Sequence, residues 1–554
     1  MAPRGLLIAL VLAHVALAPA ARAASYVVAP AGDDAASGSA EAPWRTIRRA
    51  AAAVQPGDVV DVQPGLYVES VPLGVSGTAL APIQFRAAAG TALASPDPAA
   101  SLSAFDVGSG VGHVVLDGFA AGGGFHETIL LRPGAHHIVL RGLELSGNRV
   151  GIWIAGASDV TVDACSVHHN DLGVRVLAGS ARVTVRDTVS AFNDDGRGCD
   201  GDADGFAVEE TSAEVTFTDC RAEGNGEDGF DLQGDAMLLS GIESRANGCA
   251  GLKLSQNARV ENALVVGNQT GVTTTSFFAL PVLAEIVSST IADNRGTQLL
   301  LRSPAGAPAG SARVRLRNLI AAGPGKIVEV ESAVGLDEDH NLFYRPDTTS
   351  AVIVRHLAEG AERRYTGQQV NGGLWAAESG QGAGTLAIDP QFAERETYAV
   401  DPASPALDRG EMAGAPAADR HGAPRPFGDG VDLGPDELAV AVANHRPWPD
   451  PGPERTIGVG ERFRVQATGS VDPDGSPLTY RWDFGDGSAG EAGYFAWHTY
   501  ATPGDYTLSL AADDGTVSAA RSVVLHIVAA ATPTATPTPT LVPTASATPA
   551  DTAT

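Results

Sequence analysis

The chain has 554 residues and a formal net charge of -28, with 65 acidic residues against 37 basic ones. This length is too great for one ordinary globular core, so we expect two or more modules. The acidic balance argues against a nucleic-acid partner, because binding phosphates requires a basic surface. A polyanionic partner would need an intervening cation, and a solubility role is the simpler interpretation of most of the acidic residues.

Residues 1–23 have the pattern of a secretory signal peptide. Arg4 precedes an apolar run over residues 6–17, and Ala21-Arg22-Ala23 is an Ala-X-Ala cleavage pattern. The run is too short to span a membrane, and no later segment qualifies. We therefore expect a secreted, extracellular and monomeric protein, either free or associated with a cell surface.

Residues 24–82 predict an N-terminal cap and the first strands of a solenoid. A short amphipathic helix is expected over about residues 44–54, with Trp44, Ile47 and Ala51 on the face that covers the open end. The segments Tyr26-Val-Val-Ala-Pro and Pro64-Gly-Leu-Tyr resemble the N-terminal cap of secreted right-handed parallel β-helix proteins.

Residues 83–345 contain short alternating strands with one asparagine per unit. The successive intervals are 22, 23, 32, 22 and 21 residues, between Asn148, Asn170, Asn193, Asn225, Asn247 and Asn268. A coil of about 22 residues fits three short strands and three turns. The asparagines predict a stacked ladder with a spacing of about 4.8 Å, or, equally compatibly, turn residues with positive φ. The long interval holds an acidic insertion over residues 194–204, where a solenoid usually places its function.

The remainder of the chain loses this period. Residues 346–443 are expected to form terminal coils and a C-terminal cap. Residues 444–528 contain Val471-Asp-Pro-Asp-Gly and Tyr480-Arg-Trp-Asp-Phe-Gly-Asp-Gly, which resemble a PKD domain, an immunoglobulin-like β-sandwich. Residues 529–554 have the Ala/Thr/Pro composition of an extended linker or tail. The predicted fold is all-β: a right-handed parallel β-helix followed by this β-sandwich.

A repeated phrase, X-Gly-(Phe/Leu)-Z-(Val/Leu), aligns the coils with one another. Its outward position forms a column that comprises Trp153, Arg175, Ala207, Asp231, Lys253 and Thr273. Asp204 and Asp228 form a second column three positions earlier. Together with Glu227 and Asp231 they predict a cluster of carboxylates that repel one another unless a cation neutralises them.

Calcium is the cation that such a cluster favours, because it takes six to eight oxygen ligands from flexible acidic groups. Asp200-X-Asp202-X-Asp204-Gly matches the opening of a calcium loop, but Thr211 stands at position twelve, so a complete EF-hand is not expected. The alternative is a solvated acidic turn. Lys253 lies one coil from Asp231, where a divalent ion would lower its pKa and make it a usable base. The alternative interpretation of Lys253 is a solvated surface charge.

Three segments resemble the pectate lyases of polysaccharide lyase family nine: Asp-Ala-Asp-Gly-Phe (202–206), Glu-Asp-Gly-Phe-Asp-Leu (227–232) and Gly-Leu-Lys-Leu (251–254). The resemblance implies a right-handed β-helix that cleaves a uronate polymer, pectate above all, by β-elimination. It implies Ca²⁺ ligands at Asp204 (or Asp202), Glu227, Asp228 and Asp231, with Lys253 as the base. This chain departs from the family pattern at Glu227, where aspartate is expected, and in the compact coil between Asp231 and Lys253.

Several alternatives stay open at this point. Arg175 is a candidate for binding a distal substrate carboxylate, and a solvated arginine is the competing interpretation. An alginate lyase, a uronan epimerase or a non-catalytic glycan-binding adhesin with structural calcium would use the same scaffold.

The four cysteines allow up to two disulfides. Cys199 and Cys249 are the favoured pair, and Cys165 and Cys220 are expected to lie two coils apart, too far to bond.

Overall fold

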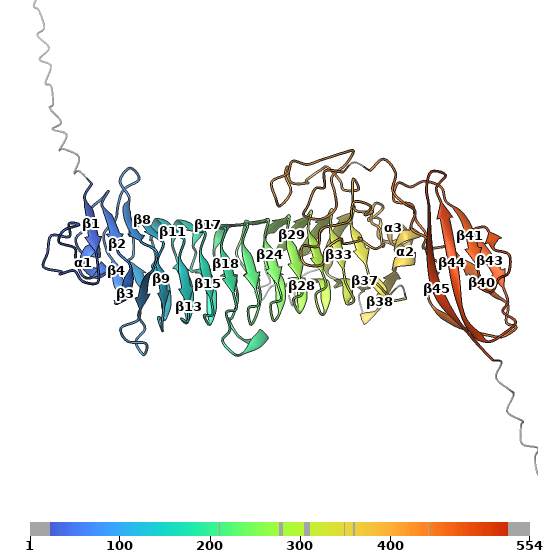
Figure 1. The fold of residues 1–554 in the computed structure, drawn as a ribbon, viewed down its shortest axis with the longest axis horizontal. Helices are drawn as coiled ribbons and strands as arrows, with labels where there is room; N and C mark the ends of the chain where they lie inside the picture. Colours follow the sequence, from blue (N-terminus) through green and yellow to red (C-terminus); the bar gives the residue numbers. More distant parts are fainter. Residues whose placement is uncertain are drawn as a thin grey trace, which may run out of the picture.

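The computed structural model describes residues 23–529 except residues 210, 276–280, 304–310, 348, 358–359 and 441. The predicted signal peptide and most of the predicted tail lie outside the described residues. No helix within the described ranges is long and apolar enough to cross a membrane. The described chain forms a long stack of strands with a small helix at its N-terminal end and a separate β-sandwich at the other (Figure 1).

Three sheets of parallel strands make up the stack, and each coil of the chain adds one strand to each sheet. Sheet A contains β1 (Ser25–Val28), β2 (Val59–Val62), β5 (Ile83–Ala87), β8 (Gly112–Asp117), β11 (His136–Arg141), β14 (Ser158–Asp163), β17 (Ala181–Arg186), β20 (Ala213–Thr218), β23 (Met237–Ser240), β26 (Ala258–Glu261), β29 (Val282–Val287), β32 (Ala312–Arg317) and β35 (Val334–Asp339). Sheet B contains β3 (Gly65–Val68), β6 (Thr91–Ala94), β9 (Ala120–Gly122), β12 (Glu144–Ser146), β15 (Ser166–His168), β18 (Val189–Ala191), β21 (Arg221–Glu223), β24 (Glu243–Arg245), β27 (Leu264–Val266), β30 (Thr290–Ala292), β33 (Ile320–Ala322) and β36 (Leu342–Tyr344).

Sheet C contains β4 (Val71–Leu73), β7 (Phe105–Val107), β10 (Glu127–Leu131), β13 (Val150–Ala155), β16 (Leu172–Leu177), β19 (Phe206–Val208), β22 (Phe230–Leu232), β25 (Ala250–Leu254), β28 (Thr270–Thr274), β31 (Thr297–Leu301), β34 (Lys326–Val330), β37 (Ala351–His356) and β38 (Glu362–Thr366). Every pairing in this sheet is parallel except β37 with β38, which is antiparallel. The predicted parallel β-helix is therefore confirmed.

The core follows from the alternation of residues along each strand. On β16, Val174 and Val176 are buried, while Arg175 between them faces outward. The same alternation on β19 and β22 stacks Phe206 on Phe230 inside the helix, with ring centroids 4.8 Å apart. Each such buried side chain stabilises the fold by about 1.5–3 kcal/mol, so the apolar positions fix which residues point outward.

The asparagines form the predicted ladder. From Asn170 to Asn268, each side-chain Oδ1 accepts a hydrogen bond from the backbone N–H of the asparagine one coil earlier, at 3.1 Å for Asn193 to Asn225 and 3.0 Å for Asn225 to Asn247. The residue with positive φ is the one before each asparagine, such as Phe192 (53°) and Ala246 (53°). The interpretation of the asparagines as positive-φ residues is therefore wrong, because the left-handed position of each turn is the residue before the asparagine.

The N-terminal end is covered by α1 (Ile47–Ala51), which is shorter than the helix expected over residues 44–54. Trp44, Ile47 and Ala51 are all buried, as the amphipathic pattern predicts. Trp44 precedes the helix and instead forms a parallel bridge with Val28, so tertiary pairing begins the segment as a strand.

Near the other end, α2 (Gly367–Asn371) and α3 (Leu374–Ser379) follow β38. The buried indole of Trp375 on α3 donates a 2.5 Å hydrogen bond to Glu338. The β-sandwich is built from β39 (Arg455–Gly458), β40 (Phe463–Gln466), β41 (Thr479–Asp483), β42 (Glu491–Ala492), β43 (Phe495–His498), β44 (Gly504–Asp513) and β45 (Ser518–Val528). Its own core, around Trp482 and Tyr500, is separate from the core of the β-helix, which confirms the all-β prediction of two modules.

Candidate metal and active site

Strands β19, β22 and β25 of sheet C carry the candidate site. Ala207 pairs with Asp231, and Asp231 pairs with Lys253, so the repeated phrase is in register from coil to coil. The outward column extends to Arg175 and Trp153 on one side and to Thr273 on the other. The Asn ladder lies in the turns before these strands and holds their starting points in line.

Three acidic residues meet at the N-terminal ends of β19 and β22. Carboxylate oxygens of Asp204, Glu227 and Asp228 lie within 4.8 Å of one another, and all three residues are buried. The backbone N–H of Asp228 donates to Asp204 Oδ1 at 3.1 Å, and that of Ala250 donates to Asp228 Oδ1 at 2.6 Å. One carboxylate from each coil is thus fixed by the backbone of the next coil.

Lys253 faces this cluster from β25. Its Nζ lies 2.9 Å from Asp231 Oδ2 and 3.2 Å from Asp228 Oδ2. The side chain is largely buried, with 16% of its surface exposed. Lys253 and Lys326 are the two lysines of the sequence, and the other residues of the Lys+Arg count are arginines.

Burial and mutual repulsion shift the pKa values of this group. Burial, reinforced by the charge of Asp228, raises the pKa of Glu227 to about 8. Burial and the charges of Asp231 and Asp228 hold the pKa of Asp204 well above its usual range. Burial opposes the charged form of Lys253, but the neighbouring Asp231 and Asp228 outweigh it and raise the pKa of the ammonium. One ammonium therefore does not neutralise the acids around it.

The residues present fit a calcium ion. The donor set is made of carboxylate oxygens, which a hard cation prefers. Among the described side chains, Asp231 Oδ1 is a buried atom without a hydrogen-bond partner, although its sister oxygen binds Lys253 and Gln233. An unpaired buried carboxylate oxygen is costly, and a bound cation would satisfy it.

Asp202 and Arg175, two of the predicted site residues, lie outside the cluster of buried acids. The Asp202 side chain is 68% exposed, and it lies 3.9 Å from Arg175 without joining the three buried acids. Arg175 is on the same outward column, where Glu209 accepts its hydrogen bonds at 2.6 and 2.9 Å and Trp153 lies under its guanidinium. Glu209 was missed from the sequence, because it follows β19 in a segment without the repeated phrase.

The acidic insertion is tied by a disulfide to the turn before β25, two coils farther along the stack. The favoured disulfide is present between Cys199 and Cys249, whereas Cys165 and Cys220 are buried free thiols. Inside the insertion, Asp195 accepts hydrogen bonds from the backbone of Arg197 and Asp202. The disulfide attaches the insertion beside β25, next to the candidate site, whereas the Asp195 bonds order the insertion itself. Asp195 was not singled out from the sequence.

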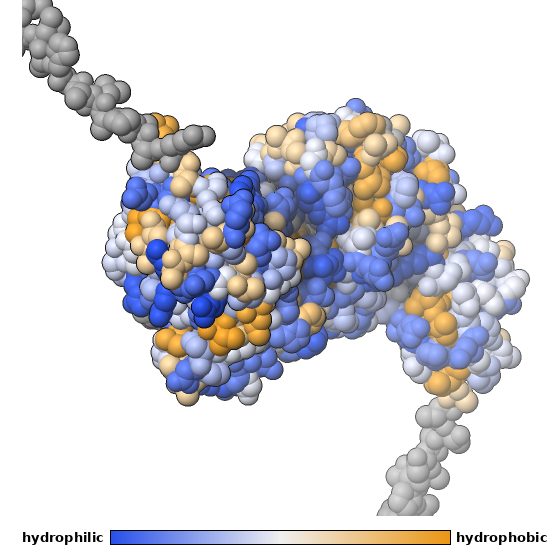
Figure 2. All heavy atoms as spheres, turned by 60° about the vertical axis from the view of Figure 1, so that its left-hand side comes forward, coloured by the Kyte–Doolittle hydropathy of each residue, from blue (hydrophilic) through white to orange (hydrophobic). Residues whose placement is uncertain are grey.

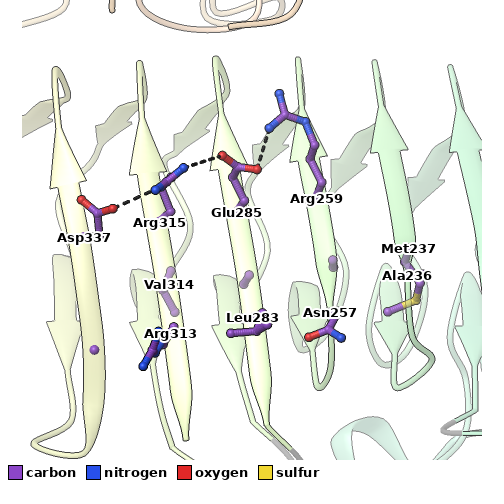
Figure 3. Close-up of a pocket in the computed structure, with 13 residues that line it drawn as sticks. Ala236, Met237, Asn257, Arg259, Leu283, Glu285, Arg313, Val314, Arg315 and Asp337 are labelled. Atoms are coloured by element: carbon purple, nitrogen blue, oxygen red, sulfur yellow. Dashed lines mark hydrogen bonds and ion pairs between the residues drawn. The ribbon is translucent and has the colours of Figure 1, made fainter. Parts of the chain in front are cut away.

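A cavity of about 640 Å³ lies elsewhere, on sheet A over β23 to β35. Figure 3 shows Arg259, Glu285, Arg315 and Asp337 side by side on successive strands, joined by ion pairs of 2.6, 3.6 and 3.1 Å. These four charges alternate in sign and neutralise one another. Arg313 also lines the cavity, so the cavity has no excess of acidic groups. Hydrophilic residues cover most of the face seen in Figure 2, with smaller hydrophobic patches between them.

The fold and the site together define a parallel β-helix protein with a buried carboxylate–lysine cluster on one sheet and a C-terminal β-sandwich. Residues 26–275 match the family model described as "Pel9A-like, right handed beta helix region", and residues 444–528 match that of the PKD domain. The first match lies within the β-helix, and the second covers the β-sandwich.

Individual relatives are distant. "Pectate lyase PEL9" of Emericella nidulans (strain FGSC A4) is 26% identical over 257 residues, which are 46% of this chain and 59% of the relative. The chain thus spans less than two thirds of that relative's length. The solved structure of pectate lyase Pel9A is 18% identical to this chain, with a TM-score of 0.45. The match covers 75% of this chain and 96% of the Pel9A chain. The structure of XylC in complex with xylose is 11% identical to this chain, with a TM-score of 0.48. The match covers 75% of this chain and 99% of the XylC chain.

Proposed function

We propose that this chain is a secreted, monomeric, calcium-dependent polysaccharide lyase that cleaves a uronate polymer, pectate above all, by β-elimination. The observation that carries the proposal is the contact of Lys253 with two buried acids of the preceding coil, Asp231 and Asp228, at 2.9 and 3.2 Å. Its position in a Pel9A-like region supports the same activity.

Asp204, Glu227, Asp228 and Asp231 would hold the calcium ion. When bound, Ca²⁺ supplies positive charge that attracts the C6 carboxylate of a uronate, acidifies its C5 proton and stabilises the charge that develops on proton loss. The backbone donors to Asp204 and Asp228 keep both carboxylates in place before substrate arrives. This pre-organisation is what a catalytic site requires.

A cation held by Asp228 and Asp231 would offset the charges that keep the Lys253 ammonium protonated, and Lys253 Nζ, as the neutral amine, would then take the C5 proton. The electron pair of the C5–H bond forms the C4–C5 double bond, and the C4–O bond breaks with its electrons on the departing oxygen, which is then protonated by solvent. No oxidant or reductant is needed. A lysine suits this role where an arginine does not, because the guanidinium does not lose its proton in proteins. Arg175 is proposed to bind a substrate carboxylate farther along the column.

The test is incubation of the purified chain with polygalacturonate and with alginate, with Ca²⁺ or EDTA, while the absorbance of unsaturated uronates is followed. Product should form only with Ca²⁺. Lys253→Ala should lower the rate by at least 1,000-fold while calcium binding persists. Lys326→Ala, which removes the other lysine from an exposed pair with Glu329, should leave the rate unchanged. Full activity of Lys253→Ala would overturn the assignment of the base.

A non-catalytic role is the second candidate: it holds if Lys253 stays paired with Asp231 and Asp228 when the cation is bound, because a salt-bridged ammonium is no base. In that case calcium would bind and stabilise the fold, and no polymer would yield unsaturated product. The polymer panel also separates the enzymatic alternatives. Product from alginate alone would identify an alginate lyase, and a changed uronate composition without unsaturated ends would identify an epimerase.

A further inference from the structure

Three histidines gather on sheet A, away from the acidic cluster. His113 lies on β8, and His136 and His137 lie on the next strand, β11. The register pairs Gly112 with His136 and Val114 with Ile138, so His113 and His137 occupy the same place on adjacent coils. The acids of the candidate site lie on sheet C at β19 to β25, several coils farther along the chain.

The three imidazoles converge. One ring nitrogen from each lies within 4.8 Å of the others, and the Nδ1 atoms of His136 and His137 are 2.9 Å apart. The ring centroids of His113 and His137 are 4.5 Å apart. A Cβ at Gly112 would lie 2.2 Å from the His136 ring, so the absence of a side chain there is what lets the ring lean over β8.

The donor chemistry is that of a borderline transition-metal ion. Two nitrogens 2.0–2.1 Å from a tetrahedral ion are about 3.3 Å apart, so small rotations of these rings would provide that geometry. A neutral imidazole donates a nitrogen lone pair to such an ion. Carboxylates suit Ca²⁺, whereas imidazoles suit Zn²⁺, Ni²⁺ and Cu²⁺.

We propose that His113, His136 and His137 form a second metal site, which binds one Zn²⁺ ion through three imidazole nitrogens with water in the fourth position. The ion connects two coils of the β-helix near its N-terminal end. The competing account is that the rings only stack on and hydrogen-bond to one another.

The test uses the full chain, freed of metal and held in saturating Ca²⁺ so that the acidic cluster is occupied. Zn²⁺ is added in a calorimetric titration, and thermal unfolding is followed in parallel. His113→Asn and His137→Asn are suitable variants, because both positions have positive φ (57° and 53°), which asparagine tolerates. Each should weaken Zn²⁺ binding at least tenfold and abolish the rise in unfolding temperature that Zn²⁺ causes in the parent.

His169→Asn is the matched control. His169 also has a φ of 53° and forms an Nδ1–Nδ1 contact of 2.8 Å with His168, but its next neighbour is the ring of Phe192. This variant should bind Zn²⁺ as the parent does. The proposal is overturned if the parent binds no Zn²⁺ under these conditions, or if the cluster variants bind it as tightly as the control. Because binding is measured without substrate, the result is independent of lyase activity.

Discussion

Replacing Asn225 by alanine tests how far the ladder controls both stability and the site. The Asn225 side chain is buried, with 2% of the residue exposed. Its Oδ1 accepts from the backbone N and Nδ2 of Asn193 at 3.1 and 2.8 Å, and its Nδ2 donates to Ser190 O and Asn247 Oδ1 at 3.1 and 2.9 Å. Four hydrogen bonds are lost at about 0.5–1.5 kcal/mol each.

Two of the partners keep other contacts. Asn193 Nδ2 still reaches Ser190 Oγ, and Asn247 Oδ1 still accepts from the backbone of residue 225. We therefore expect Asn225→Ala to lower the free energy of unfolding of the β-helix by about 3 kcal/mol. Glu227 and Asp228 follow directly, so uronate cleavage should also fall at temperatures where the variant is folded. Denaturant titration followed by circular dichroism measures the first effect, and the absorbance assay measures the second.

Asn148→Ala is the control, because Asn148 makes comparable contacts with Phe125, Ala121 and Ser146 in the turn before β13. It should lose stability and keep activity. A loss below about 1 kcal/mol for Asn225→Ala would refute the reasoning that the ladder amides are worth their usual hydrogen-bond energies. Equal loss of activity in both variants would show that the ladder does not act on the site locally.

Two further predictions concern the disulfide and the C-terminal cap. The double variant Cys199→Ser, Cys249→Ser removes the cross-link that closes a loop of 50 residues. In the chain-entropy account it should lower the free energy of unfolding by up to about 4 kcal/mol, measured as a lower denaturation midpoint. An unchanged midpoint would mean that the ladder alone holds the insertion. Burial raises the pKa of Asp432 to about 7. The folded state therefore binds more protons than the unfolded state between about pH 4 and 7, and stability falls as pH rises through that window. Asp432→Asn should remove up to about 1.4 kcal/mol per pH unit of this dependence, measured by denaturation across the range.

The features that repeat with the coil could be predicted from the sequence. Once the period is known, stacking fixes which residues are neighbours, so the column of Asp231 and Lys253 and the ladder of asparagines follow from alignment alone. The Cys199–Cys249 pair was the remaining choice, because Cys165 and Cys220 fall at equivalent positions two coils apart, too far to bond. Inward valines and phenylalanines fix the outward direction of the column with no further information.

The features outside the repeated phrase could not be predicted in this way. Asp202 and Asp204 have the same local sequence signal, and the structure separates them because the backbone N–H of Gly205 bonds the carbonyl of Asp228 and aligns Asp204 with the site. Asp202 stays in the insertion, outside the repeat. The histidine cluster had a usable signal, since His113 and His137 are one coil apart, but no repeated phrase on sheet A drew attention to that alignment.

The columns also show which clusters need a ligand. In a stack, every outward side chain meets those of the coils on either side, so alternating charges are the arrangement that stabilises a column by itself. Arg182 with Asp159 and Arg259 with Glu285 follow that arrangement. The acids at the N-terminal ends of β19 and β22 do not alternate, and burial together with repulsion among them raises the pKa values of Asp204, Glu227 and Asp228. Side chains that repel without a partner weaken the fold, and this is the physical reason to expect a cation at the acidic cluster and none in the alternating columns.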